Sequence, residues 1–489
     1  MLGQQNNIED KVNSLRSKTV SGVIWSVTER FGMIGVKFVM GIVLARLLTP
    51  ADFGLIAMVT VFFAIAEVFI SSGLGMAYIQ KKEVDDTDAD TVFYTNLGIS
   101  VAIYLLLYFG APLIAGFYNQ PQLVELTRVM AFVLIINAFT IIQDAKIVRD
   151  VNFKKLAKIK LTSSLLSGSI GITAAYYGLG VWALVIRSML DRFFISVGFW
   201  ITSSYRPKRR FSKKSFQDMF SFGSWVLITG ITREIFNNIY ILAIGRLFPV
   251  AQLGYYTKAK QLSQTFSQNM VGAISAVSFP VLSRVQDDTV RHRNVMRKFL
   301  QHTLLFTLVP LVGLIVVAEP FVLLFLTDKW APMIIYLQLL CIAGILYPIH
   351  TINVQAITSL GKTKIAFKLS FLRKILRLLN IILMYRYGVF YIILGEVVLS
   401  FIILILNTWY MDRFVGYGLR RQIRDVWKIV VAGLLAGYLG FLPTLISESL
   451  WIHLGAGVTI TGAAYFIIQF LINKKLLMDS FALIKSVSK

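Results

Sequence analysis

The sequence has few of the residues that enzymes most often use for metal, redox or nucleotide chemistry. It contains one cysteine, Cys341, and four histidines, His292, His302, His350 and His453, with no metal-ligand spacing among them. A single cysteine excludes an intramolecular disulfide and a cysteine-based metal site. The sequence also contains no GxxxxGK[ST] phosphate loop and no HExxH motif. We therefore predict a protein that is not an enzyme, with no catalytic residue, metal site or cofactor.

Charged residues are scarce, and acidic ones especially so. Only 15% of the 489 residues are charged, against about 25% in a soluble protein, and 56% are hydrophobic. This composition is typical of a membrane protein. The 49 basic and 25 acidic residues give a net charge of +24, which in a soluble chain would suggest nucleic-acid binding. Here the basic residues lie in short connections between apolar runs, which favours a membrane-topology signal and no nucleic-acid partner.

Long apolar stretches recur along the whole chain. A transmembrane helix needs about 20 such residues to cross the hydrocarbon layer. We predict an all-α polytopic protein with about 14 spans, at 20–46, 53–78, 92–116, 122–143, 156–177, 182–203, 218–245, 254–280, 299–326, 332–358, 365–386, 389–410, 427–442 and 452–472. Twelve are well formed, and the last pair is weaker.

The basic residues alternate between connections in a way that predicts orientation. With the N-terminus inside, 34 lysines and arginines fall in inside connections and four fall in outside ones. Inside loops of membrane proteins are enriched in these residues. We therefore expect both termini to be cytoplasmic. The outside connections are short, which argues against a polysaccharide polymerase or ligase with a large external catalytic loop.

An offset of 200 residues suggests an internal repeat. Identical residues recur at both ends of the first and seventh spans, at Ser21/Ser221, Trp25/Trp225, Arg46/Arg246, Leu47/Leu247, Ala51/Ala251 and Gly54/Gly254. Six spans separate the two helices, so both halves begin with the same orientation, as in parallel-repeat transporters. Chance similarity between apolar helices is the alternative.

Eleven basic residues lie within or at the edges of spans, where each costs roughly 2.5–3.5 kcal/mol if it faces lipid. Such residues must reach the interface, pair with carboxylates or face a polar cavity. We predict that a cationic cavity is lined by Arg30, Lys37, Lys258, Lys260, Arg373 and Arg377. Arg373 and Arg377 are four residues apart and share a helix face. A cavity of this charge suits a polyanion, such as the diphosphate of a lipid-linked sugar.

The spans also contain carboxylates. Arg187, Asp191 and Arg192 are close in sequence and are expected to form structural pairs. A carboxylate in a medium of low dielectric constant has a raised pKa and can carry a proton. Candidate coupling carboxylates are Glu29, Glu67, Asp191 and Glu234.

Two strings resemble a known family. LARLLTPADFGLIAM (44–58) and SSGLGMAYIQKKE (71–83), which leads to Phe93-Tyr94, are similar to segments of the polysaccharide exporters. These are the Wzx-like flippases of O-antigen, colanic acid and teichuronic acid, in a superfamily with lipid II flippases and multidrug extruders. The specific strings lie within about the first 100 residues, and they indicate the family without indicating the glycan.

The resemblance implies two six-helix lobes around a central cationic cavity, with alternating access to the two leaflets. The expected division is an N-terminal lobe at 1–205, a C-terminal lobe at 206–415, and a final helix pair with a cytoplasmic tail at 416–489. The tail after Asn473 is expected to be either disordered or a short amphipathic helix on the inner leaflet, with Leu476, Leu477, Phe481 and Ile484 toward lipid.

The function implied is translocation of an undecaprenyl-diphosphate-linked oligosaccharide repeat unit across the bacterial inner membrane, for surface polysaccharides such as lipopolysaccharide. The expected partners are that lipid-linked oligosaccharide and membrane lipids, and further candidates are a polysaccharide polymerase and glycosyltransferases. Two alternatives remain open, a multidrug extruder of the same superfamily and a non-transporting component of a polysaccharide assembly complex. The excess of bases over acids in the spans disfavours the extruder, which should present an acidic cavity to cationic drugs.

Overall fold

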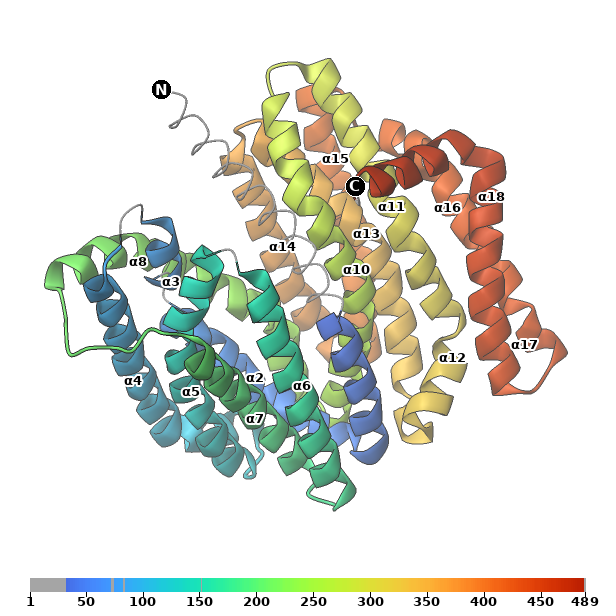
Figure 1. Ribbon diagram of the computed structural model, residues 1–489. Helices are drawn as coiled ribbons and strands as arrows, with labels where there is room; N and C mark the ends of the chain where they lie inside the picture. Colours follow the sequence, from blue (N-terminus) through green and yellow to red (C-terminus); the bar gives the residue numbers. More distant parts are fainter. Residues whose placement is uncertain (1–31, 72–73, 82–83, 151, 488–489) are drawn as a thin grey trace. The chain divides into compact units, whose positions relative to one another are not determined.

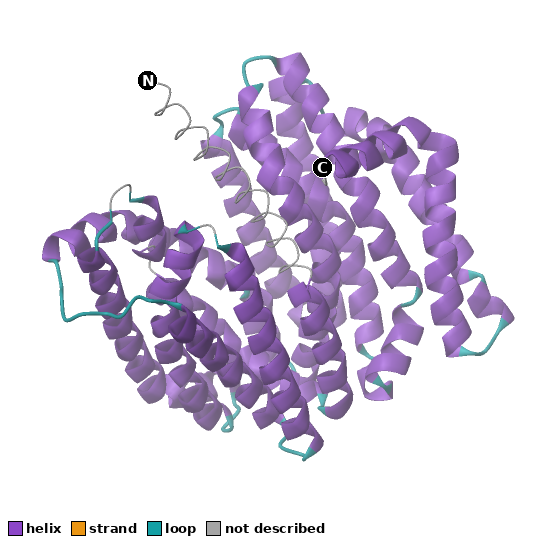
Figure 2. Ribbon diagram, in the orientation of Figure 1, coloured by secondary structure: helices purple, strands orange, loops and turns teal. Residues whose placement is uncertain are grey.

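The computed structural model describes residues 32–71, 74–81, 84–150 and 152–487 of the chain (Figure 1). Within these ranges the regular structure is helical throughout, and no strand occurs (Figure 2). The prediction of an all-α polytopic fold is therefore confirmed. In a bilayer each backbone amide must be satisfied inside its own segment, and a helix achieves this.

The chain divides into two compact units, Met1–Gly254 and Tyr255–Lys489. In the first unit residues 32–47 are helical, followed by α2 (Pro50–Ser71), α3 (Leu74–Gln80), α4 (Asp86–Tyr118), α5 (Leu123–Arg149), α6 (Phe153–Tyr176), α7 (Val181–Thr202), α8 (Lys213–Asn237) and α9 (Ile239–Leu247). Consecutive long helices pack as neighbours, notably α4 with α5 and α6 with α7. The division expected from the sequence, at 205 and 415, remains a prediction.

Helix α10 (Val250–Arg284) begins at the end of the first unit and continues into the second. The second unit then contains α11 (Thr289–Val316), α12 (Ala318–Phe321), η1 (Val322–Leu326), η2 (Asp328–Trp330), α13 (Met333–Ser359), α14 (Thr363–Met384), η3 (Tyr385–Tyr387), α15 (Val389–Val415), α16 (Leu419–Phe441), α17 (Pro443–Ile446) and α18 (Leu450–Val487). Its apolar core gathers side chains from α11, α13, α15, α16 and α18.

Eight helices of the described chain are long and apolar enough to cross a membrane, in α2, α4, α5, α11, α13, α15, α16 and α18. Five further long helices, α6, α7, α8, α10 and α14, coincide with predicted spans but carry more polar or charged residues. In α14, for example, Lys364, Lys368, Arg373, Lys374 and Arg377 interrupt the apolar sequence. The count of 14 spans therefore remains a prediction.

The 200-residue offset has a counterpart in a contact within the first unit. A Cβ atom added at Gly54, in the second turn of α2, would overlap the carbonyl oxygen of Val250, the first residue of α10. A Cβ atom added at Gly254 would in turn overlap the carbonyl oxygen of Pro50, the first residue of α2. Small residues allow helix backbones to approach closely. The two glycines thus make the same contact in both directions, as equivalent positions of a repeat would.

The other repeat positions are less informative. Ser21 and Trp25 lie outside the described residues, and the side chains of Ser221 and Trp225 are likewise not described. Arg246 lies over the Phe117 ring, 5.7 Å from its centroid. The relation between the two whole halves remains a prediction.

The C-terminal segment forms a helix that packs on the protein. Helix α18 bends at Asn473, whose backbone is not helical (φ −135°, ψ 37°), and the rest of the helix turns toward α11 (Figure 1). Leu477 is 5% exposed inside the core of the second unit, and Leu476 packs against that core. Ser480 contacts His302 of α11, with 2.6 Å between Oγ and Nδ1. The expectation that both leucines face lipid was therefore wrong.

Candidate anion-binding cavity

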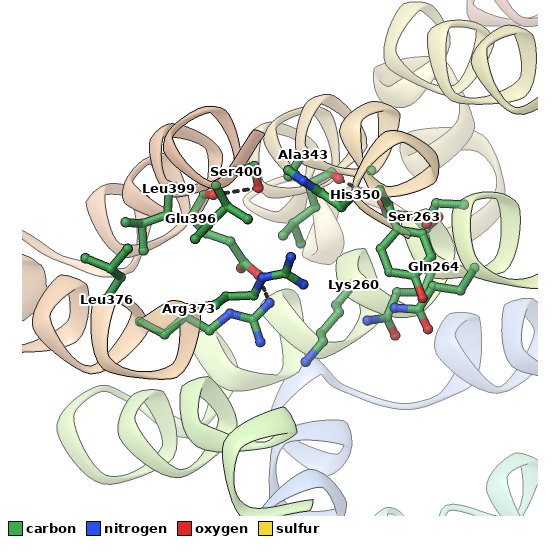
Figure 3. Close-up of a pocket in the computed structure, with 17 residues that line it drawn as sticks. Lys260, Ser263, Gln264, Ala343, His350, Arg373, Leu376, Glu396, Leu399 and Ser400 are labelled. Atoms are coloured by element: carbon green, nitrogen blue, oxygen red, sulfur yellow. Dashed lines mark hydrogen bonds and ion pairs between the residues drawn. The ribbon is translucent and has the colours of Figure 1, made fainter. Parts of the chain in front are cut away.

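Four helices of the second unit, α10, α13, α14 and α15, surround a cavity of about 140 Å³ (Figure 3). Its lining is more polar than expected for helices that contact lipid on all sides. Each helix contributes polar side chains, and α10 contributes the most. The volume is below the roughly 300–1,000 Å³ of a typical small-molecule site, so it suits one charged group better than an oligosaccharide.

Three cations converge on this space. Arg373 and Arg377 lie one turn apart on α14, and Lys260 projects from the third turn of α10. Among the described residues of the lining, the one carboxylate is Glu396 of α15, so these residues carry an excess of positive charge. Figure 3 shows the side chains of Lys260, Arg373 and Glu396 reaching toward the same space. The charge pattern of the sequence predicted that these three cations share a cavity, and the structure places them together.

The cavity contains one ion pair. Nη2 of Arg377 lies 3.5 Å from Oε1 of Glu396, whose side chain is 16% exposed. The other carboxylate oxygen, Oε2, is buried and has no hydrogen-bond partner within the described chain. The Ser400 hydroxyl donates to the backbone carbonyl of Glu396, one turn earlier on α15. One oxygen of Glu396 is therefore paired with Arg377, while the other is unsatisfied in a cavity that three cations line.

A close helix contact forms the opposite wall. The Ser263 hydroxyl of α10 donates to the Leu340 carbonyl of α13 at 2.9 Å, and Ser267 donates to the Ser263 carbonyl at 3.0 Å. A Cβ atom at Gly344 would lie 3.1 Å from the Ser263 hydroxyl. Glycine at this position lets α13 approach α10 closely, which keeps both serines out of lipid.

His350 of α13, one of the four histidines without metal-ligand spacing, also lines the cavity. It is 7% exposed, and its Nδ1 lies 3.4 Å from Nδ2 of Asn407 on α15. With the amide as donor, the proton of the neutral imidazole lies on Nε2. That nitrogen is buried and has no partner within the described chain. His350 therefore both joins α13 to α15 and presents a hydrogen-bond donor to the cavity lining.

The other predicted cations are not in this cavity. Lys258 is only 4% exposed on α10 and is not part of the lining. Lys37 belongs to the first unit, in the helix at 32–47, where its charge interacts with that of Asp191. Arg30 lies outside the described residues. A site shared by all six predicted cations remains a prediction.

Two of the predicted carboxylates, Glu67 and Asp191, have polar partners on neighbouring helices of the first unit. Oε1 of Glu67 on α2 lies 3.1 Å from Nη2 of Arg192 on α7, and Arg192 also donates to the Asn137 amide oxygen of α5 at 3.3 Å. Asp191 accepts a hydrogen bond from Ser167 of α6 at 3.3 Å. These contacts tie α2, α5, α6 and α7 together.

The two remaining candidates differ. Glu234 forms an ion pair of 3.4 Å with its neighbour Arg233 on α8. Glu29 lies outside the described residues. Within the described chain, no group of three or more histidine, cysteine, aspartate or glutamate residues is placed to hold a metal ion.

The fold is that of polytopic membrane proteins of known structure. It matches the lipid II flippase MurJ in an inward closed conformation with a TM-score of 0.74, over 94% of this chain and 100% of that one, at 16% sequence identity. It matches an inward-facing multidrug resistance MATE family transporter of the MOP superfamily with a TM-score of 0.60, over 78% of this chain and 94% of that one, at 15% identity.

The sequence identifies the family within this class. A family model described as Polysaccharide biosynthesis protein matches residues 43–335, more than half of the chain, and the chain belongs to this family. The lipopolysaccharide biosynthesis protein WzxC of Escherichia coli is 26% identical over 441 residues, covering 88% of this chain and 87% of that protein. The succinoglycan biosynthesis transport protein ExoT of Rhizobium meliloti is 26% identical, covering 69% of each chain. The resemblance inferred from the sequence strings is confirmed.

Proposed function

We propose that this protein is a flippase that moves an undecaprenyl-diphosphate-linked oligosaccharide repeat unit across the bacterial inner membrane by alternating access, for surface polysaccharide synthesis. Relatives named for the biosynthesis of lipopolysaccharide and the transport of succinoglycan support this proposal. The fold shared with a lipid II flippase also supports it. The observation that carries it is the convergence of Lys260, Arg373 and Arg377 inside an apolar helix bundle.

The diphosphate of such a substrate matches this cavity chemically. Arginine binds phosphate through a planar fork of N–H donors, and lysine does so as a point charge. In the absence of substrate, the Glu396 carboxylate occupies part of this donor set through Arg377. An arriving diphosphate competes with Glu396 for Arg377 and gains further contacts with Arg373 and Lys260. Charges gathered inside the membrane at a cost are thereby used for recognition.

Binding alone does not produce transport. A ligand shifts a conformational equilibrium only by as much as its affinity differs between the two states. The proposal therefore requires the cations to hold the diphosphate more weakly once the site faces the outer leaflet. The candidate coupling carboxylates Glu29, Glu67, Asp191 and Glu234 are where a proton would be carried. Glu67 suits this role because its partner Arg192 belongs to a different helix, so protonation of Glu67 would weaken a contact between two helices.

The substrate's charge distinguishes this proposal from a multidrug extruder. The cavity has three cations and one carboxylate, which repels the cationic compounds such extruders remove. A polymerase and glycosyltransferases, which would supply or consume the repeat unit, are the proposed partners within the same biosynthetic system.

The test is export in a strain that lacks the chromosomal copy and carries a plasmid variant. We expect the Arg373→Gln/Arg377→Gln variant to reduce surface polysaccharide at least about tenfold, because each substitution removes a charge-assisted contact with the diphosphate. The amount of polysaccharide on the cell surface is measured by immunoblotting, normalised to the amount of protein in the membrane.

The matched control is Arg386→Gln in η3, directly after α14, where the arginine is exposed and contacts Tyr385. Export by this variant should stay within about twofold of the wild type. Full export by the Arg373→Gln/Arg377→Gln variant at normal protein levels would exclude the cavity as the diphosphate site.

A further inference from the structure

A second polar cavity, of about 370 Å³, lies at the end of the second unit where α11 and α16 begin. It is lined by four arginines, Arg293 and Arg297 of α11 and Arg421 and Arg424 of α16, together with Tyr417 and Asp425. This cavity shares no residue with the one between α10, α13, α14 and α15. Its lining has three more positive than negative side chains, which is a strong bias for so small a space.

A buried carboxylate builds this site. The Asp425 side chain is 7% exposed, and its Oδ1 lies 3.0 Å from Nη2 of Arg297. Its Oδ2 accepts a hydrogen bond of 3.0 Å from the Tyr417 hydroxyl. Burial and the Asp425 charge raise the pKa of Tyr417, so this hydroxyl remains a donor at any physiological pH. The Gln301 amide donates to the Asp425 carbonyl at 2.7 Å, which fixes α16 against α11.

The remaining arginines are held around a tight turn. Gly416 ends α15 in the left-handed region (φ 64°), and its carbonyl accepts a hydrogen bond from Arg421. A Cβ atom at Gly416 would lie 3.0 Å from Nη1 of Arg421 and 3.6 Å from Nη1 of Arg293. These two guanidinium groups, from different helices, are therefore close neighbours. Two like charges this close repel each other, and an anion bound between them would offset the repulsion.

An apolar surface begins directly beside the arginines. On α16, Ile423 is 53% exposed and Trp427 is 48% exposed, and the exposed apolar side chains continue along the helix through Leu434 and Tyr438. Helix α16 is one of those apolar enough to span a membrane. Tryptophan is enriched at the membrane–water interface. An arginine-lined cavity beside an exposed apolar surface is the arrangement expected of a site at the level of lipid headgroups.

We propose that this cavity binds the phosphate headgroup of an anionic phospholipid, with the acyl chains lying along the exposed face of α16. Arg293, Arg421 and Arg424 hold the phosphate, while Arg297 is fixed by Asp425. Basic pockets between membrane helices commonly select anionic headgroups. The site is separate from the proposed transport cavity, and it is tested by measuring lipid binding and not transport.

The experiment measures binding of fluorescent phosphatidylglycerol to the purified full-length protein in neutral detergent. The Arg293→Gln/Arg424→Gln variant should bind it about tenfold more weakly, because two charge-assisted contacts are lost. The matched control is Arg413→Gln/Arg420→Gln, which removes two exposed arginines near the same connection that do not line the cavity. Its affinity should stay within about twofold of the wild type. The single variant Arg424→Gln gives an independent measurement if the double variant is poorly folded.

Competition distinguishes the sources of phosphate. Unlabelled phosphatidylglycerol should displace the probe, whereas phosphatidylcholine and inorganic phosphate should not at the same concentration. Equal loss of binding in the two double variants would show a diffuse surface charge effect and would overturn the proposal. Displacement by inorganic phosphate as effective as by phosphatidylglycerol would identify a free-anion site and would also overturn it.

Discussion

At the scale of residues, the proposed recognition of an anion by the second unit depends on individual charges. Arg377 and Glu396 form an ion pair in the wall of the anion-binding cavity, and Oε2 of Glu396 is left without a partner in the described chain. A buried charge pair gains little net stability, because desolvation offsets the attraction between the charges. We therefore expect a stronger anion to displace Glu396 from Arg377.

We predict that Glu396→Gln increases the affinity for undecaprenyl diphosphate about tenfold, or about 1.4 kcal/mol, because the neutral amide no longer competes for Arg377. Fluorescence titration of the purified protein measures this affinity. The control is Glu319→Gln, a neutralisation at an exposed position on α12. Unchanged or weaker binding by Glu396→Gln would show that the carboxylate does not compete with the ligand.

Sequence reasoning found the cations of this site but not its neutral members. Arg373 and Arg377 were predictable because charges in an apolar helix are costly and their four-residue spacing defines a common face. His350 was not, because a single histidine in an apolar run gives no spacing signal. Its partner Asn407 is 57 residues away, and only the fold brings the two together.

At the scale of elements, the sequence indicates which helices form more reliably than what covers them. The segment after Asn473 is amphipathic, but an apolar face has the same pattern whether lipid or protein covers it. In the structure the bend at Asn473 returns this segment to α11, and Leu477 completes the core of the second unit.

We predict that Leu477→Ala lowers the stability of the protein by about 2–5 kcal/mol, the usual range for a leucine truncated in a core. The midpoint of thermal unfolding in detergent measures the change. The neighbouring Met478 is 56% exposed, so Met478→Ala should leave the midpoint nearly unchanged. A midpoint unaffected by Leu477→Ala would mean that the segment contributes no packing in the membrane.

At the scale of the whole molecule, the predicted topology depends on the sequence alone. The 34-to-4 distribution of basic residues depends on the order of spans and not on how helices pack. The five polar helices show where hydropathy fails to identify a span. Helix α14 is one example, because the cations that line the cavity make its sequence less apolar.

The orientation is testable with single cysteines in a Cys341→Ala background. We expect Gln122→Cys and Glu448→Cys to react with a membrane-impermeant maleimide in intact cells, because both connections are predicted to be outside. Arg209→Cys and Asp287→Cys should react only after permeabilisation. All four native residues are exposed. The opposite pattern would invert the topology, and a mixed pattern within one unit would show that the predicted number of spans is wrong.

Where α2 and α10 cross, residue size is restricted at two positions that are far apart in the sequence. A side chain at Gly54 or at Gly254 would displace a backbone carbonyl on the opposite helix, and each helix supplies both a glycine and a carbonyl to the crossing. Mutations 200 codons apart would therefore damage the same point. In genetic terms the two glycines form a single target, and a larger residue at one cannot be relieved by a smaller residue at the other, because nothing is smaller than glycine.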